Sequence, residues 1–457
     1  MFIRSRREFL RDSVRSVSAL GAMSLLAKFG EMNALAQSSS GYQALVCIFM
    51  QGGNDSHNTV IPVSTAQQNF SLYQKSRGPL ALPQNVLHLI ANGSDTYGLH
   101  QDMPEMASLY NSGKMAVLAN VGNLVLPVTR AAYTSNSAVV PDALFSHSDQ
   151  TNQWQSAMPN GFATSGWGGR MSDLMQSQNS GSIFPPVTSV NNCGIFCDGK
   201  QTHPATVPPP WTGSTSPTGM AVLNGIQNSP STAAGLQQLL TFDNGLQLVQ
   251  AGNGVLSNGI NYADTLTKLL QTSTLTTTFP ANNNLAAQLQ TVANMMSVRT
   301  QLGLTRQIFF CQIGSFDTHA NQHATQAQLF KQLSQAVSAF YAATQELGIA
   351  GNVTTFTTSE FGRTLNPSGN DGSDHAWGSH HFIMGGGVQG GKIYGNFPSL
   401  VLGGNDDANN RGVLIPSTAI AQYGATMAQW FGVGASDLPT VFPNIANFTS
   451  TNLGFLA

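Results

Sequence analysis

Charged side chains are scarce in this sequence. Asp, Glu, Lys and Arg make up 9% of its 457 residues, against about 25% in a typical soluble protein. The formal net charge is −2, and no basic run is present that could follow a phosphate backbone, so we do not expect nucleic acid as a partner. Asn, Gln, Ser, Thr and Gly take the place of charge, which indicates a secreted or periplasmic surface.

Long apolar runs are also missing. A membrane-spanning helix needs about 20 consecutive apolar residues, and no segment reaches that length, so we expect no stable membrane span. The moderately apolar stretch 17–29 is rich in Ser, Gly and Ala, and it lies between a basic start and the small residues Ala34 and Ala36. This order is typical of an export signal that is cleaved after Ala36.

The start of the chain carries paired arginines in Ser5-Arg6-Arg7-Glu8-Phe9-Leu10, which resembles the twin-arginine export signature. The resemblance implies that the twin-arginine translocase is a partner during export and that the folded protein works in the periplasm or is secreted. We therefore assign residues 1–36 to a twin-arginine signal peptide and residues 37–457 to the mature protein. The alternative is an ordinary amphipathic helix that contains two adjacent arginines.

Cysteine is rare, with four in the chain. Cys193 and Cys197 are four residues apart, and an oxidising compartment favours a disulfide between them. A metal site there would need two more soft ligands, which the neighbouring sequence lacks. Cys47 and Cys311 lie inside apolar, strand-like runs, so we expect them to be small buried core residues.

What the sequence does contain is a set of runs of strand length. Residues 43–50, 115–121 and 307–313 are apolar, and 353–358 is rich in β-branched residues. Continuous apolar runs are typical of strands that are covered on both faces in a parallel sheet. Apolar residues at spacings of three and four over 324–347 predict a long helix between the last two strands. Strand, helix and strand form a βαβ unit with a right-handed crossover, so the fold class is α/β.

The segment at about 200–305 differs from the rest of the chain. Residues 203–219 are rich in Pro, Ser and Thr and predict an exposed loop. Helices are expected at 232–250 and at 284–303, so we interpret the segment as a mainly helical insertion on the sheet. A final helix is expected at 418–431.

Three acidic residues directly follow predicted strands: Asp55, Asp317 and Glu360. The carboxyl ends of parallel strands meet at one edge of a sheet, where ligands bind. Three carboxylates there would repel one another unless a cation held them. A single Asp in such a turn is more often a helix cap, but the coincidence of all three favours a metal site.

Histidines gather in the same part of the chain, since five of the ten lie between residues 319 and 381. Mixed Asp, Glu and His ligands suit zinc, manganese or iron better than calcium, so we expect a divalent metal ion, with zinc or manganese as the first choices. The alternative for a lone His is a polar surface residue. The candidate ligands are Asp55, Asp317, His319, Glu360, Asp374, His375 and His380.

Six short motifs together resemble a bacterial family known as domain of unknown function 1501. They are Gly52-Gly53-Asn54-Asp55, Ser146-His147, Gly166-Trp167-Gly168-Gly169-Arg170, Phe316-Asp317-Thr318-His319, Ser359-Glu360-Phe361-Gly362-Arg363-Thr364 and Asp374-His375-x-Trp377-Gly378. The family is grouped with the alkaline-phosphatase and sulfatase superfamily. The resemblance implies a three-layer α/β/α sandwich with a mostly parallel central sheet over residues 37–457. It also implies a metal site at the carboxyl edge and hydrolysis of phosphate or sulfate esters.

The resemblance places metal ligands at particular residues. Asp55 and Asp317 correspond to metal-binding aspartates of the superfamily, and the partner of Asp317 is His319 or His323. Asp374 with His375, or else His380, stands for the histidine ligand that comes late in the chain. Glu360 falls where the superfamily has Asp followed by His. Here Phe361 replaces that His, which argues against a complete second metal site.

The resemblance also implies a nucleophile at the start of a helix. Ser146 is the first candidate, with Ser148 and Ser56 as alternatives, while the Cys-x-Pro-x-Arg signature of sulfatases is absent. Arg170 or Arg363 could hold the anionic group of a substrate by paired hydrogen bonds. The alternative for each arginine is a structural ion pair.

These observations predict an exported, metal-dependent hydrolase whose substrate is an anionic ester or a glycan. The alternative is a non-catalytic periplasmic or surface protein that keeps the fold and binds a polysaccharide or a protein. The replacement of His by Phe361 favours this alternative, and the many Asn and Gln residues fit sugar binding as well as catalysis.

Overall fold

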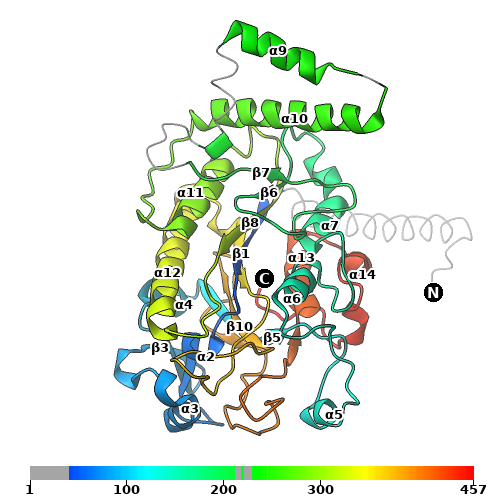
Figure 1. Cartoon of the computed structure of the whole chain (residues 1–457). Coiled ribbons are helices and arrows are strands. Elements are labelled where there is room, and N and C mark those ends of the chain that lie inside the picture. The colour runs from blue at the N-terminus through cyan, green and yellow to red at the C-terminus, as the bar shows by residue number, and fades with distance from the viewer. Residues whose placement is uncertain (1–40, 211–217, 221–228, 244) are drawn as a thin grey trace, which may run out of the picture. The chain divides into compact units, whose positions relative to one another are not determined.

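The structure is a computed structural model of the chain (Figure 1). The chain divides into two compact units, Met1–Tyr42 and Gln43–Ala457, and the second unit is described below. The signal peptide expected at residues 1–36 lies outside the described residues. The structure describes residues 41–210, 218–220, 229–243 and 245–457.

A nine-stranded sheet forms the centre of the second unit. Its strands are β1 (Gln43–Met50), β5 (Met115–Gly122), β6 (Val187–Ser189), β7 (Ala205–Thr206), β8 (Arg306–Ile313), β9 (Val353–Thr358), β10 (Ser379–Met384), β11 (Ile393–Tyr394) and β12 (Thr418–Ala419). The order is β11-β5-β10-β9-β1-β8-β6-β7, and β12 also pairs with β5. Only β10 runs antiparallel to its neighbours, β5 and β9. The predicted α/β class with a mostly parallel sheet is confirmed.

Helices cover both faces of this sheet and complete three layers (Figure 1). One layer contains α4 (Pro104–Asn111), α11 (Asn284–Ser297) and α12 (Gln322–Glu346). The other contains α6 (His147–Ser156), α7 (Trp167–Leu174), α13 (Ile420–Phe431) and α14 (Leu438–Val441). The sheet is therefore shielded from water on both sides, as its apolar strands require.

Strand β1 shows why the apolar runs could be assigned from sequence. It lies between β8 and β9 and is parallel to both. Its residues from Ala44 to Met50 are all buried, because helices cover both faces. Helix α12 places Phe330, Leu333 and Val337 in the core, in keeping with the predicted spacing of three and four.

Several short elements lie between β1 and β5. A small antiparallel sheet has the order β2-β4-β3, with β2 at Val60–Ser64, β3 at His88–Asn92 and β4 at Asp95–Leu99. The short helices here are α2 (Ser56–Thr59) and α3 (Phe70–Arg77), and α5 (Arg130–Thr134) follows β5. The 3-10 turns with given bounds among the described residues are η1 (Gly78–Leu80), η2 (Gln84–Val86), η3 (Gln176–Asn179), η5 (Ala350–Asn352), η6 (Ala435–Asp437) and η7 (Ile445–Asn447).

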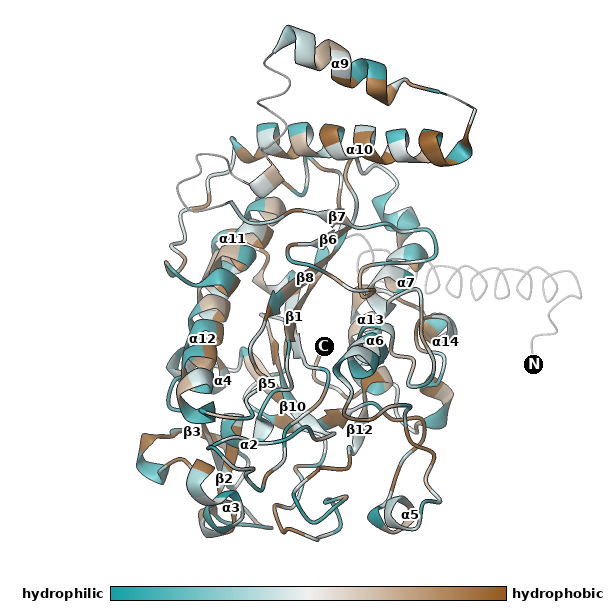
Figure 2. Ribbon diagram, viewed as in Figure 1, coloured by the Kyte–Doolittle hydropathy of each residue, from teal (hydrophilic) through white to brown (hydrophobic). Residues whose placement is uncertain are grey.

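The helix predicted at 232–250 is instead two helices, α9 (Pro230–Leu240) and α10 (Gln247–Leu270). A turn separates them, in which Asp243 Oδ1 accepts hydrogen bonds from the backbone N–H of Gly245 at 2.7 Å and from Gln250 Nε2 at 3.0 Å. Gly245 has a φ of +80°, which a helix cannot accommodate. Figure 2 shows hydrophobic residues along both helices, and Leu248 is 85% exposed.

The disulfide predicted between Cys193 and Cys197 is not formed, and all four cysteines are free. The backbone N–H of Cys197 donates to Cys193 Sγ at 3.3 Å. Cys197 is packed into the hydrophobic core, whereas Cys193 is only partly buried against it. Burial raises the pKa of both Cys47 and Cys311, in agreement with their prediction as core residues.

Across the described part of the chain, no helix has both the length and the apolar character needed to cross a membrane.

Candidate metal centre

The sheet topology brings separate segments of the chain to one edge. Parallel strands β1, β8 and β9 end there and are followed by Asp55, Asp317 and Glu360. Because β10 is antiparallel to β9, the residues that precede β10 reach the same edge, and these include Asp374 and His375. Carboxylates and histidines far apart in sequence therefore approach one another at the edge where α/β proteins bind ligands.

Gly52 allows the strand ends to come close together. Its φ is +120°, and a Cβ atom at this position would lie 2.3 Å from the backbone nitrogen of Asp317, so a side chain is excluded. The Gly52 N–H donates to Glu360 Oε1 at 2.7 Å, and the Gly52 carbonyl accepts from Arg363 Nη1 at 3.0 Å. Gly52 is thus hydrogen-bonded to the segment that follows β9 and packs closely against the segment that follows β8.

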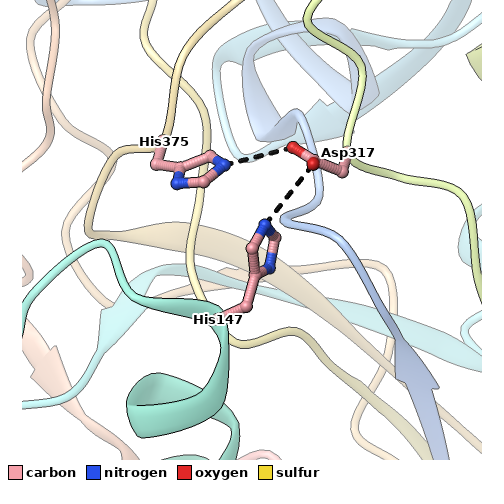
Figure 3. Close-up of side chains that lie close together, drawn as sticks. All are labelled: His147, Asp317 and His375. Atoms are coloured by element: carbon pink, nitrogen blue, oxygen red, sulfur yellow. Dashed lines mark hydrogen bonds and ion pairs between the residues drawn. The ribbon is translucent and has the colours of Figure 1, made fainter.

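Asp317 is the centre of a group of three histidines, two of which are shown in Figure 3. Its Oδ1 atom lies 3.0 Å from His319 Nε2 and 3.1 Å from His375 Nε2. Its Oδ2 atom lies 3.5 Å from His147 Nε2. The four side chains are between 22% and 47% exposed, so the group, here called the Asp317 cluster, is open to solvent.

Hydrogen bonds on the outer side of each ring determine which nitrogen faces Asp317. The Nδ1 atoms lie opposite acceptors: the Phe145 carbonyl oxygen for His375 (2.9 Å), Asp374 Oδ1 for His319 (3.3 Å) and Glu360 Oε1 for His147 (2.9 Å). We assign the hydrogen of each neutral ring to Nδ1 for this reason. The Nε2 atoms then present lone pairs toward Asp317, the arrangement found when a histidine binds a metal.

The same contacts shift the pKa values of the cluster. The hydrogen bond to Glu360 is the main reason that the pKa of His147 is raised. Burial lowers the pKa of His375. For Asp317, burial acts to raise the pKa, but the hydrogen bonds and charges of Arg363 and the histidines outweigh it, so the pKa is lowered. The cluster therefore combines an anionic carboxylate with a neutral His375.

The donor atoms fit a metal ion. His319 Nε2 and His375 Nε2 are 3.1 Å apart, and two facing lone pairs repel each other unless a cation lies between them. Donors that bind one ion at about 2.0–2.2 Å lie roughly 3–3.5 Å from one another. His147, Asp317 and His375 offer ligand atoms that all lie within 4.8 Å of one another. Nitrogen and carboxylate donors of this kind suit zinc or manganese.

Phe361 forms an apolar wall of the cluster. It is buried, and its ring centroid lies 4.8 Å from that of His147 and 4.5 Å from that of His375. The residue that replaces a superfamily histidine therefore packs against two imidazoles and limits their rotation. It offers no ligand atom of its own.

Two of the predicted ligands lie outside the Asp317 cluster. Asp55 is completely buried, and its Oδ2 atom pairs with Arg77 and accepts from Gln322 Nε2 at 2.6 Å. His380 is buried within β10, where its Nδ1 atom accepts from the backbone N–H of Asn120 at 3.0 Å. Burial lowers the pKa of His380 to about 3, so this ring is a neutral part of the core.

The remaining predicted ligands, Glu360 and Asp374, contact the cluster from outside. Each accepts from the Nδ1 atom of a histidine whose Nε2 faces Asp317. Asp374 also pairs with Arg411, whose Nη2 atom lies 2.7 Å from Asp374 Oδ2. The structure thus places these carboxylates where they can orient ligands, while Asp317 supplies the carboxylate at the centre.

The two arginines predicted to hold an anion are buried and satisfied within the protein. Arg170 donates from Nη1 to the Ser165 carbonyl at 2.6 Å and from Nη2 to the Val441 carbonyl at 2.6 Å. Arg363 donates to Gly52, Asp317 and Ser373. Arg363 forms with Asp317 the structural ion pair that was its alternative, whereas Arg170 donates to backbone carbonyls.

Ser146, the predicted nucleophile, immediately precedes α6 and His147. Its Oγ atom donates to Asp149 Oδ2 and lies 3.2 Å from Ser148 Oγ. His147 was not among the ligands predicted from the sequence, because it follows no predicted strand. Its place in the Ser146-His147 motif was the one signal that could have identified it.

Comparisons with known proteins give a family and distant structural similarities. The family described as "Protein of unknown function (DUF1501)" matches residues 42–414, and no curated protein matches the sequence. The solved structure of Ps i-CgsB is 9% identical, with a TM-score of 0.37, over 90% of this chain and 77% of that chain. The PsFucS1 sulfatase from Pseudoalteromonas sp. is 10% identical, with a TM-score of 0.37, over 90% and 71%. The C-terminal periplasmic domain of EcEptC from Escherichia coli, in complex with Zn, is 9% identical, with a TM-score of 0.32, over 90% and 89%.

Proposed function

We propose that this chain, which belongs to the DUF1501 family, is an exported, metal-dependent hydrolase of phosphate or sulfate esters. The observation that supports a metal most strongly is the approach of imidazole lone pairs to one another and to Asp317, with 3.1 Å between His319 Nε2 and His375 Nε2. The position of this group at the carboxyl edge of the sheet, open to solvent, supports its use on a substrate.

In this proposal His147, Asp317, His319 and His375 hold the ion. A bound divalent metal would polarise an ester oxygen and lower the pKa of an attacking hydroxyl. Glu360 orients His147 through its 2.9 Å contact, and the Phe145 carbonyl does the same for His375. Phe145 has a φ of +75°, an uncommon conformation for a residue with a side chain, and this conformation accompanies the contact.

Ser146 is our candidate nucleophile. It lies directly before His147 at the start of α6, and its hydroxyl donates to the carboxylate of Asp149. Asp149 can take the hydroxyl proton as the oxygen attacks the ester. A Ser146→Ala variant should lose turnover and keep its metal, whereas the matched variant Ser148→Ala should keep both. Equal turnover by Ser146→Ala and the wild-type protein would reject this assignment.

Arg411 takes over the anion-binding role in this proposal, because Arg170 and Arg363 are committed elsewhere. Its side chain is 43% exposed and is joined to the cluster through Asp374. An exposed guanidinium can form paired hydrogen bonds with a phosphate or sulfate group. The substrate class remains an anionic ester, either free or carried by a glycan.

The proposed activity is tested by measuring metal content and ester hydrolysis on the same preparation. The protein would be purified without a metal-binding tag, loaded with zinc or manganese, desalted and assayed with aryl phosphate and aryl sulfate. We expect bound metal and turnover in the wild-type protein, and neither in Asp317→Asn. A wild-type protein that retains no metal after loading would contradict the proposal.

A second function is favoured by one observation, the burial of Arg170 and Arg363. Buried arginines cannot hold the anionic group of a substrate. The protein would then be a non-catalytic, metal-containing protein that binds a polysaccharide or a protein partner. Bound metal without turnover of either ester, together with retention on an anionic polysaccharide column, would favour this second function.

Export is part of the proposal and has its own test. Arg6→Lys with Arg7→Lys should leave folded precursor in the cytoplasm, because Lys cannot reproduce the paired guanidinium groups that a twin-arginine receptor reads. The wild-type protein should reach the periplasm or the medium. Normal export of the double variant would reject the twin-arginine assignment.

A further inference from the structure

Asp55 occupies a central place at the edge of the sheet. It follows β1, the strand between β8 and β9, so its carboxylate belongs to a segment that lies between those of Asp317 and Glu360. Its side chain is completely buried. A buried carboxylate needs a positive partner, because removal of a charge from water is costly. The identity of that partner decides whether Asp55 can bind a metal.

The partner is Arg77, the last residue of α3. Its Nη2 atom pairs with Asp55 Oδ2, and the rest of the guanidinium is held in place. Nη1 donates to the carbonyl oxygens of Thr364 and Leu365 at 2.8 and 2.9 Å, and Nε donates to Asn58 Oδ1 at 3.1 Å. These bonds hold the buried cation beside Asp55, so Arg77 cannot move away without leaving several acceptors unsatisfied.

The other close neighbour of Asp55 is also a hydrogen-bond donor. Gln322 Nε2 donates to Asp55 Oδ2 at 2.6 Å, and Gln322 Oε1 accepts from Ser373 Oγ at 2.5 Å. The amide is therefore oriented with its nitrogen toward the carboxylate. A metal ion requires acceptors around it, and the two side chains that face Asp55 Oδ2 offer hydrogens instead.

Asp55 is also separated from the Asp317 cluster by a second arginine. A hydrogen-bonded path runs from Asp55 through Gln322 and Ser373 to Arg363, which donates from Nη1 to Asp317 Oδ1 at 3.0 Å. A second divalent ion next to Asp55 would face the positive charges of Arg77 and Arg363 in a buried environment, where like charges repel strongly. Among the described residues, the group of three or more metal-ligating side chains does not include Asp55.

We propose that this protein binds one divalent cation, at the Asp317 cluster, and that the guanidinium of Arg77 takes the place of a second cation at Asp55. The inference rests on the proposed metal site and adds its stoichiometry. Arg77 gives the buried carboxylate a counter-charge that does not depend on metal supply. Asp55 then acts as a positioning residue, since its path through Gln322, Ser373 and Arg363 ends at the metal ligand Asp317.

The first test is the number of metal ions per chain. The full-length mature protein would be loaded with excess zinc, and separately with manganese, then desalted and analysed for metal and protein. One ion per chain is expected. Two ions would overturn this inference and leave the proposed metal site intact, whereas no ion would overturn the proposed site itself. Anomalous scattering at the metal edge from crystals should show a single peak beside His147, and a peak beside Asp55 would contradict the inference.

The second test compares two substitutions of the same kind. Asp55→Asn keeps the volume of the side chain and an acceptor oxygen for Arg77. This variant should retain one ion per chain, and its affinity for the metal should fall by less than the roughly 10-fold that loss of an outer-shell partner costs. Asp317→Asn should lose the ion. Equal loss of zinc from both variants, each checked for folding by circular dichroism, would show that Asp55 is a ligand. If Asp55→Asn does not fold, the wild-type stoichiometry and the anomalous peak still decide the question.

Discussion

Asp55 and Asp317 follow neighbouring parallel strands, yet their surroundings are opposite in character. Asp317 is 42% exposed and is surrounded by His147, His319 and His375. Asp55 is fully buried and is held by Arg77 and Gln322. The same residue type, at equivalent places in one sheet, therefore faces histidine nitrogens in the first case, whereas in the second its Oδ2 atom faces the hydrogens of Arg77 and Gln322.

The difference follows from the chemistry of the neighbouring side chains. A neutral imidazole has a lone pair and can share a metal with a carboxylate, and its charge changes near neutral pH. A guanidinium has donors only and stays protonated. The Asp317 cluster is therefore suited to exchange a cation with solvent, whereas the Asp55 pair has a permanent cation as part of the fold. A carboxylate after a strand can serve either purpose, and its partner decides which.

The largest expected effect is on stability, at the buried pair. Arg77→Met leaves the Asp55 carboxylate buried without a counter-charge, which should reduce the free energy of unfolding by about 3–5 kcal/mol. Urea unfolding of the metal-free protein measures this change. Lys75→Met is the matched control on the exposed side of the same helix, and it should change stability by less than about 0.5 kcal/mol. Equal stability of the Arg77→Met and Lys75→Met variants would contradict the conclusion that Asp55, unlike Asp317, depends on a buried arginine.

The next largest effect is on metal affinity at the open cluster. Asp317→Asn removes the anionic ligand but keeps an oxygen that can accept from Arg363. Zinc affinity should fall by more than about 100-fold, the upper end of what an outer-shell change costs, while the fold is kept. Titration of zinc into the metal-free protein gives the affinity. Asp371→Asn, an exposed residue in a nearby loop, should bind zinc as the wild-type protein does.

A smaller loss is expected from Glu360→Gln. Glu360 contacts Nδ1 of His147 at 2.9 Å and should tune the basicity of that ligand, so zinc affinity should fall by roughly 10–100-fold. Its carboxylate also raises the pKa of His147. The imidazole pKa, followed by NMR in the metal-free variant, should therefore move down toward its ordinary value. The exposed Glu346→Gln provides the control, and an unchanged His147 pKa in Glu360→Gln would contradict the proposed role.

The smallest effect on stability is expected from Arg411→Ala. The Arg411–Asp374 pair is 43% and 37% exposed, so its loss should cost less than about 1 kcal/mol. If Arg411 holds the substrate anion, KM for an aryl phosphate should rise more than kcat falls, and added salt should reduce the difference from the wild-type protein. An unchanged KM would show that Arg411 belongs to the surface and not to the proposed substrate site.

The sequence was sufficient to identify regular elements whose pattern of buried residues is regular. The run at 43–50 is β1, and the helix predicted at 324–347 is α12, at Gln322–Glu346. Strand β1 is buried from Ala44 to Met50, and α12 buries one face along its length, so local pattern and tertiary environment agree. The prediction of a single helix at 232–250 was wrong, because two helices lie there. They are separated near Asp243, whose side chain accepts hydrogen bonds from Gly245 and Gln250.

The candidate site was only partly accessible from the sequence. Asp317, His319 and His375 were selected because they cluster near strand ends, and the structure brings them together. His147 was not predicted as a ligand, because it follows no predicted strand, and only tertiary packing places the start of α6 beside Asp317. Whether those four side chains bind a metal stays a prediction.

By itself, the sequence determined the α/β class and the runs that form the central strands, because apolar runs and periodicity are local properties, and it predicted that carboxylates would gather at one edge of the sheet. The tertiary structure alone decided which carboxylate faces which partner. Arg77 lies 22 residues from Asp55 and Gln322 lies 267 residues from it, and no spacing rule connects them. Electrostatic environment depends on distances of a few ångströms between such segments, so the contrast between the open Asp317 cluster and the closed Asp55 pair appears only in the folded chain.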